Sequence, residues 1–254
     1  MRRDWNRITS VVLAAVAIAV AAPWLWHKYQ TRPDWFDPIA RYILHTGLKN
    51  TVRMAAFAVI GSTAVGIVLG TLLTIRFWPS RALIRLYIEV WRGLPIIVTI
   101  FLVYFALPRA VHAGWTSLDA FQAATVGLIL WGSAQVAEAT RGAVQSIPRE
   151  QHEAASALGF GWIGRHAFVV LPQALRRLLP PLIGLLANVI QNTTIAGIIG
   201  VAETLETGNR SIERLTYSTG SVHAFSILAC VMVVFFAISF PLTRLAAFLE
   251  KRLV

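Results

Sequence analysis

Charged residues are scarce in this chain of 254 residues. Asp, Glu, Lys and Arg together make up 14% of it, whereas soluble globular domains usually carry about 25%. Hydrophobic residues reach 56%. This balance argues against a water-soluble globular domain and indicates a protein that lies in a lipid bilayer.

Motifs of catalysis and of cofactor binding are missing too. The sequence has no G-x-x-x-x-G-K-[ST] loop, so this chain is not itself an ATPase of that class. Its six histidines lack the spacing of an H-E-x-x-H zinc helix, and we expect no metal and no cofactor in this chain. The single cysteine, Cys230, permits no disulfide within the chain, and we interpret it as an apolar filler.

Long apolar runs, in contrast, recur along the sequence, and six of them can cross about 30 Å of hydrocarbon as helices. They cover residues 8–26, 51–75, 95–111, 119–139, 179–202 and 221–243. In the second run, Gly61, Gly66 and Gly70 would let another helix approach closely. We predict an all-α polytopic membrane protein with about six transmembrane helices.

Positive charge is distributed unevenly between the segments that join these runs. If the N-terminus lies inside, most of the 23 Lys and Arg residues fall in inside segments, as the positive-inside rule describes. The net charge of +11 therefore indicates topology and not nucleic-acid binding. It predicts that the N-terminus and the C-terminus are both cytoplasmic.

The first run allows two interpretations. It could be a signal peptide cleaved near Ala21, but it is longer than the usual apolar region of about 7–15 residues. We therefore expect residues 1–45 to form an N-terminal transmembrane anchor and a periplasmic connector. Aromatic residues in 27–50 predict a short helix in the membrane interface there.

The largest segment between predicted spans, from about 141 to 178, lies inside and carries helix signals. Pro148 suits a first helical position, and Glu150 and Glu153 favour the N-terminal end. Gly159 can end the helix in the left-handed conformation. These signals predict one helix over 149–158 and a second from 162 to about 170. From the residues alone, this pair is either a surface loop or a hook that docks on a partner.

The same segment resembles the EAA loop of permease subunits of binding-protein-dependent ABC importers. The resemblance starts from "EAASALG" (153–159) and "FVVLPQA" (168–174). It extends to the polar amino-acid uptake branch through "WRGLPIIVTIFLVYFALP" (91–108), "VAEATRGAVQSIPREQHEAASALG" (136–159) and "LPPLIGLLANVIQNTTIAGIIGVAETL" (179–205). It implies a permease domain over residues 46–248 with a five-helix core, a coupling loop at about 141–178 and a cytoplasmic tail at 249–254.

In that family, the hook inserts into a cytoplasmic ATP-hydrolysing subunit, which binds the ATP and Mg. The residues that this resemblance implies for ATPase coupling are Glu153, Ala154, Ala155, Gly159, Leu171 and Pro172. It also implies further partners: an ATP-binding cassette ATPase dimer, a second permease subunit of the same or a homologous sequence, and a periplasmic or extracellular solute-binding protein.

Polar side chains gather on the fifth predicted span: Asn188, Gln191, Asn192, Thr193 and Thr194. The first three share one helical face because they are spaced i, i+3 and i+4. Such a face in a membrane either lines a pathway or bonds to another helix, and the resemblance favours the translocation pathway. Gln191 stands where the family commonly has lysine, so a substrate carboxylate is not implied at that point.

Three further sets of charged residues have simpler interpretations. Glu138 and Arg141 are three residues apart, and we expect them to pair and to position the coupling loop. Arg92 is expected to anchor a span at the interface. Glu203 and Glu206 are expected outside, either solvated or in contact with the solute-binding protein.

We therefore predict a non-catalytic permease subunit in the bacterial cytoplasmic (inner) membrane. With a second permease subunit, it would form the pathway for ATP-driven uptake of a polar amino acid. The alternative is a secondary transporter or channel driven by an ion gradient. It would need buried acidic residues in several spans, where Glu138 is almost alone. A membrane enzyme would need paired carboxylates or a Ser/Lys dyad.

Overall fold

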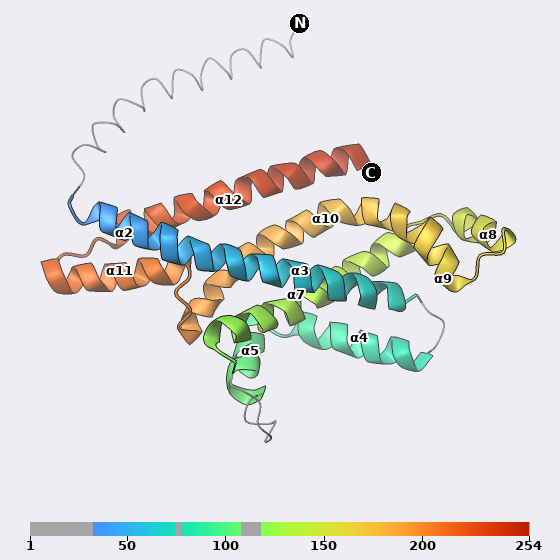
Figure 1. Ribbon diagram of the computed structural model, residues 1–254, viewed down its shortest axis with the longest axis horizontal. Coiled ribbons are helices and arrows are strands. Elements are labelled where there is room, and N and C mark those ends of the chain that lie inside the picture. Colours follow the sequence, from blue (N-terminus) through green and yellow to red (C-terminus); the bar gives the residue numbers. More distant parts are fainter. Residues whose placement is uncertain (1–32, 75–77, 108–117, 254) are drawn as a thin grey trace, which may run out of the picture. The chain divides into compact units, whose positions relative to one another are not determined.

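The computed structural model describes residues 33–74, 78–107 and 118–253 (Figure 1). The first predicted span, 8–26, lies outside these residues. The chain divides into two compact units, Met1–Arg41 and Tyr42–Val254. Within the described ranges, every regular element is helical.

The helices follow one another closely along the chain. In order, they are α2 (Phe36–Tyr42), η1 (Ile43–Leu48), α3 (Lys49–Leu72), α4 (Trp78–Gly93), α5 (Ile96–Phe101), η2 (Leu102–Ala106), α7 (Ala120–Gln145), α8 (Arg149–Ala157), α9 (Trp162–Arg165), η3 (His166–Val170), α10 (Leu171–Asn192), η4 (Thr193–Ile199), α11 (Thr204–Thr219) and α12 (Ala224–Leu253). The elements η1, η2 and η3 are π-helical, and η4 is a 3₁₀ helix.

Four helical stretches are long and apolar enough to cross a membrane: Phe36–Leu72, Ala120–Gln145, Trp162–Ile199 and Ala224–Arg252. They contain or overlap the predicted spans at 51–75, 119–139, 179–202 and 221–243, so these four predictions are confirmed. A fifth span is possible if α4 and the α5–η2 pair count as one, although the two parts meet at 109°.

Two sequence-based expectations fail in the first half of the chain. Residues 78–93 lie between the predicted spans 51–75 and 95–111, where no helix was predicted, but they form the helix α4. This helix is amphipathic, and charged residues such as Arg81, Arg85 and Glu89 interrupt any apolar run. The prediction of a separate interfacial helix is also wrong for residues 36–50, because α2 and η1 continue into α3 without a break.

The close packing of α3 on α7 depends on glycine. A Cβ atom added to Gly66 would lie 2.5 Å from Cβ of Val136 and 2.8 Å from the carbonyl oxygen of Ser133. On the α7 side, Gly132 lies against the Ser62 side chain. Without side-chain carbon at these points, the two backbones approach closely, which is how helices associate in lipid.

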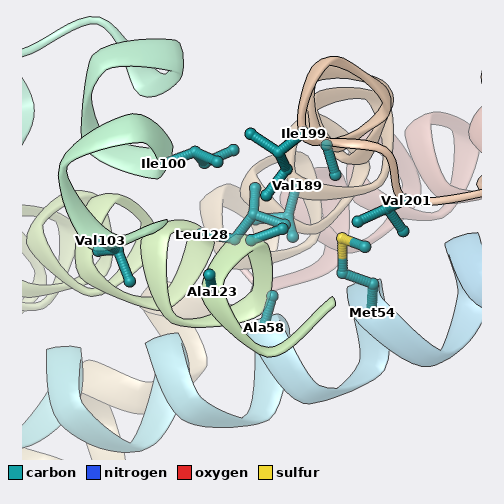
Figure 2. Packing of buried hydrophobic residues seen from close by; sticks show 11 residues of the cluster. Met54, Ala58, Ile100, Val103, Ala123, Leu128, Val189, Ile199 and Val201 are labelled. Carbon is teal, nitrogen blue, oxygen red and sulfur yellow. The ribbon is translucent and has the colours of Figure 1, made fainter. Parts of the chain in front are cut away.

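A buried apolar cluster joins six helical elements near this interface, η4 among them (Figure 2). Figure 2 shows side chains that point toward one another from α3, α5, η2, α7 and α10: Met54, Ala58, Ile100, Val103, Ala123, Leu128 and Val189. Ile199 and Val201, which follow α10, complete the labelled set. The cluster fixes the bent α5–η2 pair against the straight helices α3 and α7.

Candidate functional site

The helix α8 and the turn that follows it form the segment that we call the hook, residues 148–161. Pro148, which was predicted at the first helical position, is instead the N-cap of α8, and the helix begins one residue later at Arg149. After the C-cap Leu158, Gly159 has a φ of +85°. Its N–H donates to the Ser156 carbonyl at 3.0 Å, and the Phe160 N–H donates to the Ala155 carbonyl at 3.1 Å. This is a Schellman end, which favours glycine, so the predicted helix and its stop are both confirmed.

The second helix of the hook region differs from its prediction. It begins at Trp162 as expected, but α9, η3 and α10 follow without a break and form one stretch from Trp162 to Ile199. Pro172 lies in the first turn of α10 and does not end the helix. The π-helical turn η3 precedes it directly, and such a turn changes the hydrogen-bond spacing where a proline ring would otherwise clash. The hook is therefore followed directly by a helical stretch that is long and apolar enough to cross a membrane.

The hook exposes most of its surface. Glu153, Ala154 and Gly159 are exposed, and Leu158 is 79% exposed. Ala155 is the one buried residue of α8, at 2% exposure. Glu153 accepts a hydrogen bond from Arg149 Nε at 2.8 Å, within the same helix. Of the two coupling residues expected beyond the hook, Leu171 is half-buried and Pro172 is exposed.

Polar contacts connect the hook region to its neighbours. Arg165 of α9 donates to Ser156 Oγ at 2.9 Å. Arg177 of α10 donates to Ser146 Oγ at 3.0 Å, which ties α10 to the end of α7. Glu138 and Arg141 form the expected pair on α7, with Nε 3.0 Å from Oε2. We call the end of α7 and the start of the helical stretch at Trp162, which flank the hook, the root of the hook. These contacts hold the root in place.

The five polar residues predicted on the fifth span do not share one environment. Asn188 and Gln191 are exposed, and Asn192 is half-buried. Thr193 is buried and donates to the Ile190 carbonyl, while Thr194 donates to the Gln191 carbonyl. The reason is that α10 becomes the 3₁₀ helix η4 at Thr193, which changes the angle between successive side chains. The exposed polar face therefore consists of Asn188 and Gln191, with Asn192 at its edge.

The expectation for Glu203 is wrong. This residue is fully buried and is the N-cap of α11, where its carboxylate accepts hydrogen bonds from the N–H groups of Leu205 at 2.8 Å and Glu206 at 2.7 Å. Burial raises the pKa of this carboxyl from 4.5 to about 7, against the two backbone donors, which lower it. Glu206 instead pairs with Arg210 at 2.7 Å. Glutamate is not a favoured N-cap residue, so the sequence carried only a weak signal for this role.

Comparisons with known proteins agree on one family. A family model described as "Binding-protein-dependent transport system inner membrane component" matches residues 62–254. The glutamine transport system permease protein GlnP of Escherichia coli strain K12 is 35% identical over 211 residues, which cover 83% of this chain and 93% of that protein. The probable glutamine ABC transporter permease protein GlnM of Bacillus subtilis strain 168 is 30% identical over 218 residues, covering 86% and 95%.

Solved structures support the same fold. A crystal structure of an amino acid ABC transporter with histidines has a TM-score of 0.72 and 24% identity, and the match covers 88% of this chain and all of that one. The inward-facing MetNI methionine ABC transporter has a TM-score of 0.67 at 18% identity, covering 86% and 99%. At these identities, the likeness establishes the fold alone.

The sequence match and the apolar helices identify a multi-pass membrane protein of an importer in which a partner ATPase, and not this chain, hydrolyses ATP. The chain belongs to the family of inner membrane components of binding-protein-dependent transport systems, the permeases of ABC importers.

Proposed function

We propose that this permease takes up a polar amino acid, with glutamine as the first candidate. The observation that carries the proposal is the pair of exposed amide side chains, Asn188 and Gln191, on a helical stretch that is long and apolar enough to cross a membrane. Polar groups at membrane depth are costly unless they face a partner or a water-filled cavity. Amide groups can both donate and accept hydrogen bonds, which suits an uncharged polar side chain. Two relatives are named as glutamine permeases, and this supports the substrate class.

The exposed hook is the proposed contact with the ATPase dimer. Glu153, Ala154 and Gly159 lie on its accessible surface, and the buried Ala155 packs beneath them. Leu171 and Pro172 would hold the return of the hook, and the Glu138–Arg141 pair would position its root. The partner ATPase would bind ATP and Mg on the cytoplasmic side. The excess of basic residues in the segments predicted to lie inside supports a cytoplasmic position for the hook and for both termini.

The remaining partners follow from the family. A second permease, identical or homologous, would complete the pathway beside Asn188, Gln191 and Asn192, with Thr193 and Thr194 supporting the turn after them. A periplasmic or extracellular solute-binding protein would deliver the amino acid from outside.

Uptake into proteoliposomes tests this proposal. The complex, purified with its ATPase and binding protein, is supplied with internal ATP and a panel of radiolabelled glutamine, glutamate, histidine, arginine and leucine. We expect ATP-dependent uptake of glutamine or of another polar member. Asn188→Leu and Gln191→Leu should each lower uptake while the complex still assembles.

The matched control is Thr243→Leu, which makes the same kind of change at an exposed position on α12. It should leave uptake within about twofold of wild type, because an exposed apolar side chain on a span can face lipid. Uptake that continues without the ATPase and follows an ion gradient would contradict the proposed function. Equal losses in all three variants would contradict the role of the amide face.

A further inference from the structure

His166 joins three helical segments at the root of the hook. Its ring is 5% exposed. Nδ1 lies 2.9 Å from the carbonyl oxygen of Trp162, and Nε2 lies 3.0 Å from Oγ1 of Thr74, just beyond the end of α3. The Trp162 indole stacks on the imidazole with ring centroids 4.2 Å apart. A single side chain thus connects α9, η3 and the end of α3.

The direction of the hydrogen bonds follows from counting protons. A carbonyl oxygen can only accept, so Nδ1 of His166 must carry the proton that is donated to Trp162. In the neutral ring, Nε2 is then an acceptor, and it lies 3.0 Å from the Thr74 hydroxyl. The same hydroxyl donates to the carbonyl oxygen of Thr71 at 2.7 Å. Its one proton therefore faces two acceptors, the Thr71 carbonyl in its own segment and Nε2 of His166.

On the other side, the imidazole of His166 meets the hook itself. The ring of His152 in α8 packs edge-on against it, with centroids 6.3 Å apart. Burial, and after it the charge of Arg165, lowers the pKa of His152, which favours its neutral form in this contact. Arg165 also binds Ser156 of α8. A displacement of α8 therefore reaches His166 through packed side chains.

The contact of this region with α7 is largely apolar, apart from the Arg177–Ser146 hydrogen bond. Val170, Ala174 and Leu178 pack against Ala143 and Val144 of α7 and against Ile147, which follows it. Apolar packing is non-directional and permits small sliding between helices. The His166–Thr74 hydrogen bond joins two defined polar atoms, Nε2 and Oγ1, across 92 residues of sequence. It is suited to fixing the position of α3 relative to the hook.

We propose that His166 is a positioning residue that makes α3 move with the hook. Through its bond to Thr74, a displacement imposed on α8 by the ATPase passes to α3. From α3, it passes across the glycine-lined contact to α7 and the buried core. This inference rests on the proposed docking of the hook on the ATPase. It adds the route by which that motion enters the membrane core.

Matched variants at both ends of the bond test the route. His166→Gln keeps an acceptor near the position of Nε2, whereas His166→Asn keeps only a group near Nδ1, and both remove the aromatic ring. Thr74→Ser keeps the hydroxyl, and Thr74→Val removes it at nearly the same size. Each is measured in the full complex for ATPase co-purification, ATP hydrolysis and uptake, and the result is the number of substrates taken up per ATP.

We expect His166→Asn and Thr74→Val to assemble and to hydrolyse ATP, with uptake per ATP lower by about fivefold, the factor that one ordinary hydrogen bond supplies. His166→Gln and Thr74→Ser should stay within about twofold of wild type. The double variant His166→Asn with Thr74→Val should lose no more than either single one, since both remove the same bond. A purely structural role would lower assembly and hydrolysis together and leave the ratio unchanged.

The outcomes separate the two proposals. If wild type transports but the Asn and Gln variants behave alike, the inference is overturned while the proposed function stands. The same holds if Thr74→Val keeps the wild-type ratio. If His166→Asn fails to assemble, the two Thr74 variants, which leave the hook unchanged, decide by the same ratio. If the wild-type complex shows no ATP-driven uptake, the proposed function fails, and this inference fails with it.

Discussion

The two ends of α3 are held in different ways. At one end, Thr51 is fully buried, with Oγ1 2.8 Å from Thr204 Oγ1 and an acceptor for the Thr204 N–H at 3.1 Å. Asn50 beside it donates to the Ala202 carbonyl at 2.9 Å. At the other end, Thr74 is half-buried and reaches His166 through one hydroxyl. One end has two buried bonds and one half-buried bond, whereas among the described residues the other end reaches His166 through one half-buried bond.

The helices associated with these two ends also differ in burial. Helix α11 contacts Thr51 directly, whereas α8 reaches Thr74 only through His166. Five residues of α11 are buried, Thr204, Thr207, Gly208, Ser211 and Leu215, whereas Ala155 is the buried residue of α8. The carboxylate of Glu203 caps α11 without exposure to solvent, while the side chain of Glu153 is 62% exposed. Enclosed hydrogen bonds are strong and costly to break, and exposed ones compete with water. The Thr51 end is therefore fixed, and the hook end is free to follow a partner.

The comparison of the two ends assumes that α3 moves as one rigid helix packed on α7. Gly66→Leu tests this assumption and has the largest expected effect. The new side chain would collide with Val136 and the Ser133 carbonyl. Overpacking of this kind costs about 1–3 kcal/mol or more. We expect little folded protein by size-exclusion chromatography in detergent. Gly142→Leu is the control, since a Cβ there meets nothing within 4 Å. Wild-type behaviour of Gly66→Leu would mean that α3 does not pack on α7 here.

The same substitution, threonine to valine, can be made at each end of α3 to compare how firmly the two ends are held. Thr51→Val leaves the Thr204 hydroxyl and N–H without their buried partner, which costs about 1–3 kcal/mol. Thr74→Val removes a half-buried contact and should lower the unfolding temperature less, although it lowers uptake per ATP more. Thermal unfolding in one detergent checks the order. Equal losses of stability would show that both ends are held equally.

The substitution Gly159→Ala tests whether the left-handed turn presents the hook to the ATPase. A non-glycine residue at a φ of +85° costs about 1–2 kcal/mol, so the turn should shift and the ATPase should co-purify less well. The comparison is Gly161→Ala, because Gly161 has a φ of −65° and open space around its Cβ position. If both variants retain the ATPase to the same degree, the left-handed turn is not what presents the hook.

Local features were predictable from the sequence, and distant contacts were not. The helix 149–158 and its stop at Gly159 follow from residues adjacent in the chain, and four apolar runs mark spans. Helix α4 was missed because its charges lie among apolar residues. The burial of Glu203 depends on packing in the folded chain, where its neighbour Thr204 meets Thr51, 153 residues away in sequence. Likewise, no local pattern pairs His166 with Thr74. Long-range partners are set by the packed fold, which periodicity alone does not specify.

Near the Thr51 end of α3, the raised pKa of Glu203 predicts that the stability of the fold depends moderately on pH. Its pKa is raised from 4.5 to about 7 in the folded protein. The stabilising contribution of the protonated form is thus complete below about pH 4.5 and is lost as the pH rises through 7. The unfolding temperature of wild type should fall between pH 5.5 and 7.5 relative to that of Glu203→Gln, which cannot titrate. Parallel profiles for the two proteins would show that Glu203 keeps its ordinary pKa.

The smallest effect is expected at the exposed end, in Arg149→Gln. Both partners of the Arg149–Glu153 pair lie largely in solvent, with 88% and 62% of their side chains exposed. Such pairs contribute little because water competes with them and two long side chains must be ordered. The unfolding temperature should change by about 1 °C or less. Glu153→Gln should be equally neutral for stability but should weaken retention of the ATPase, since it changes the accessible surface of the hook. A fall in unfolding temperature with Arg149→Gln as large as that with Thr51→Val would mean that α8 is held as firmly as α11. The distinction between a fixed end and a movable end would then be lost.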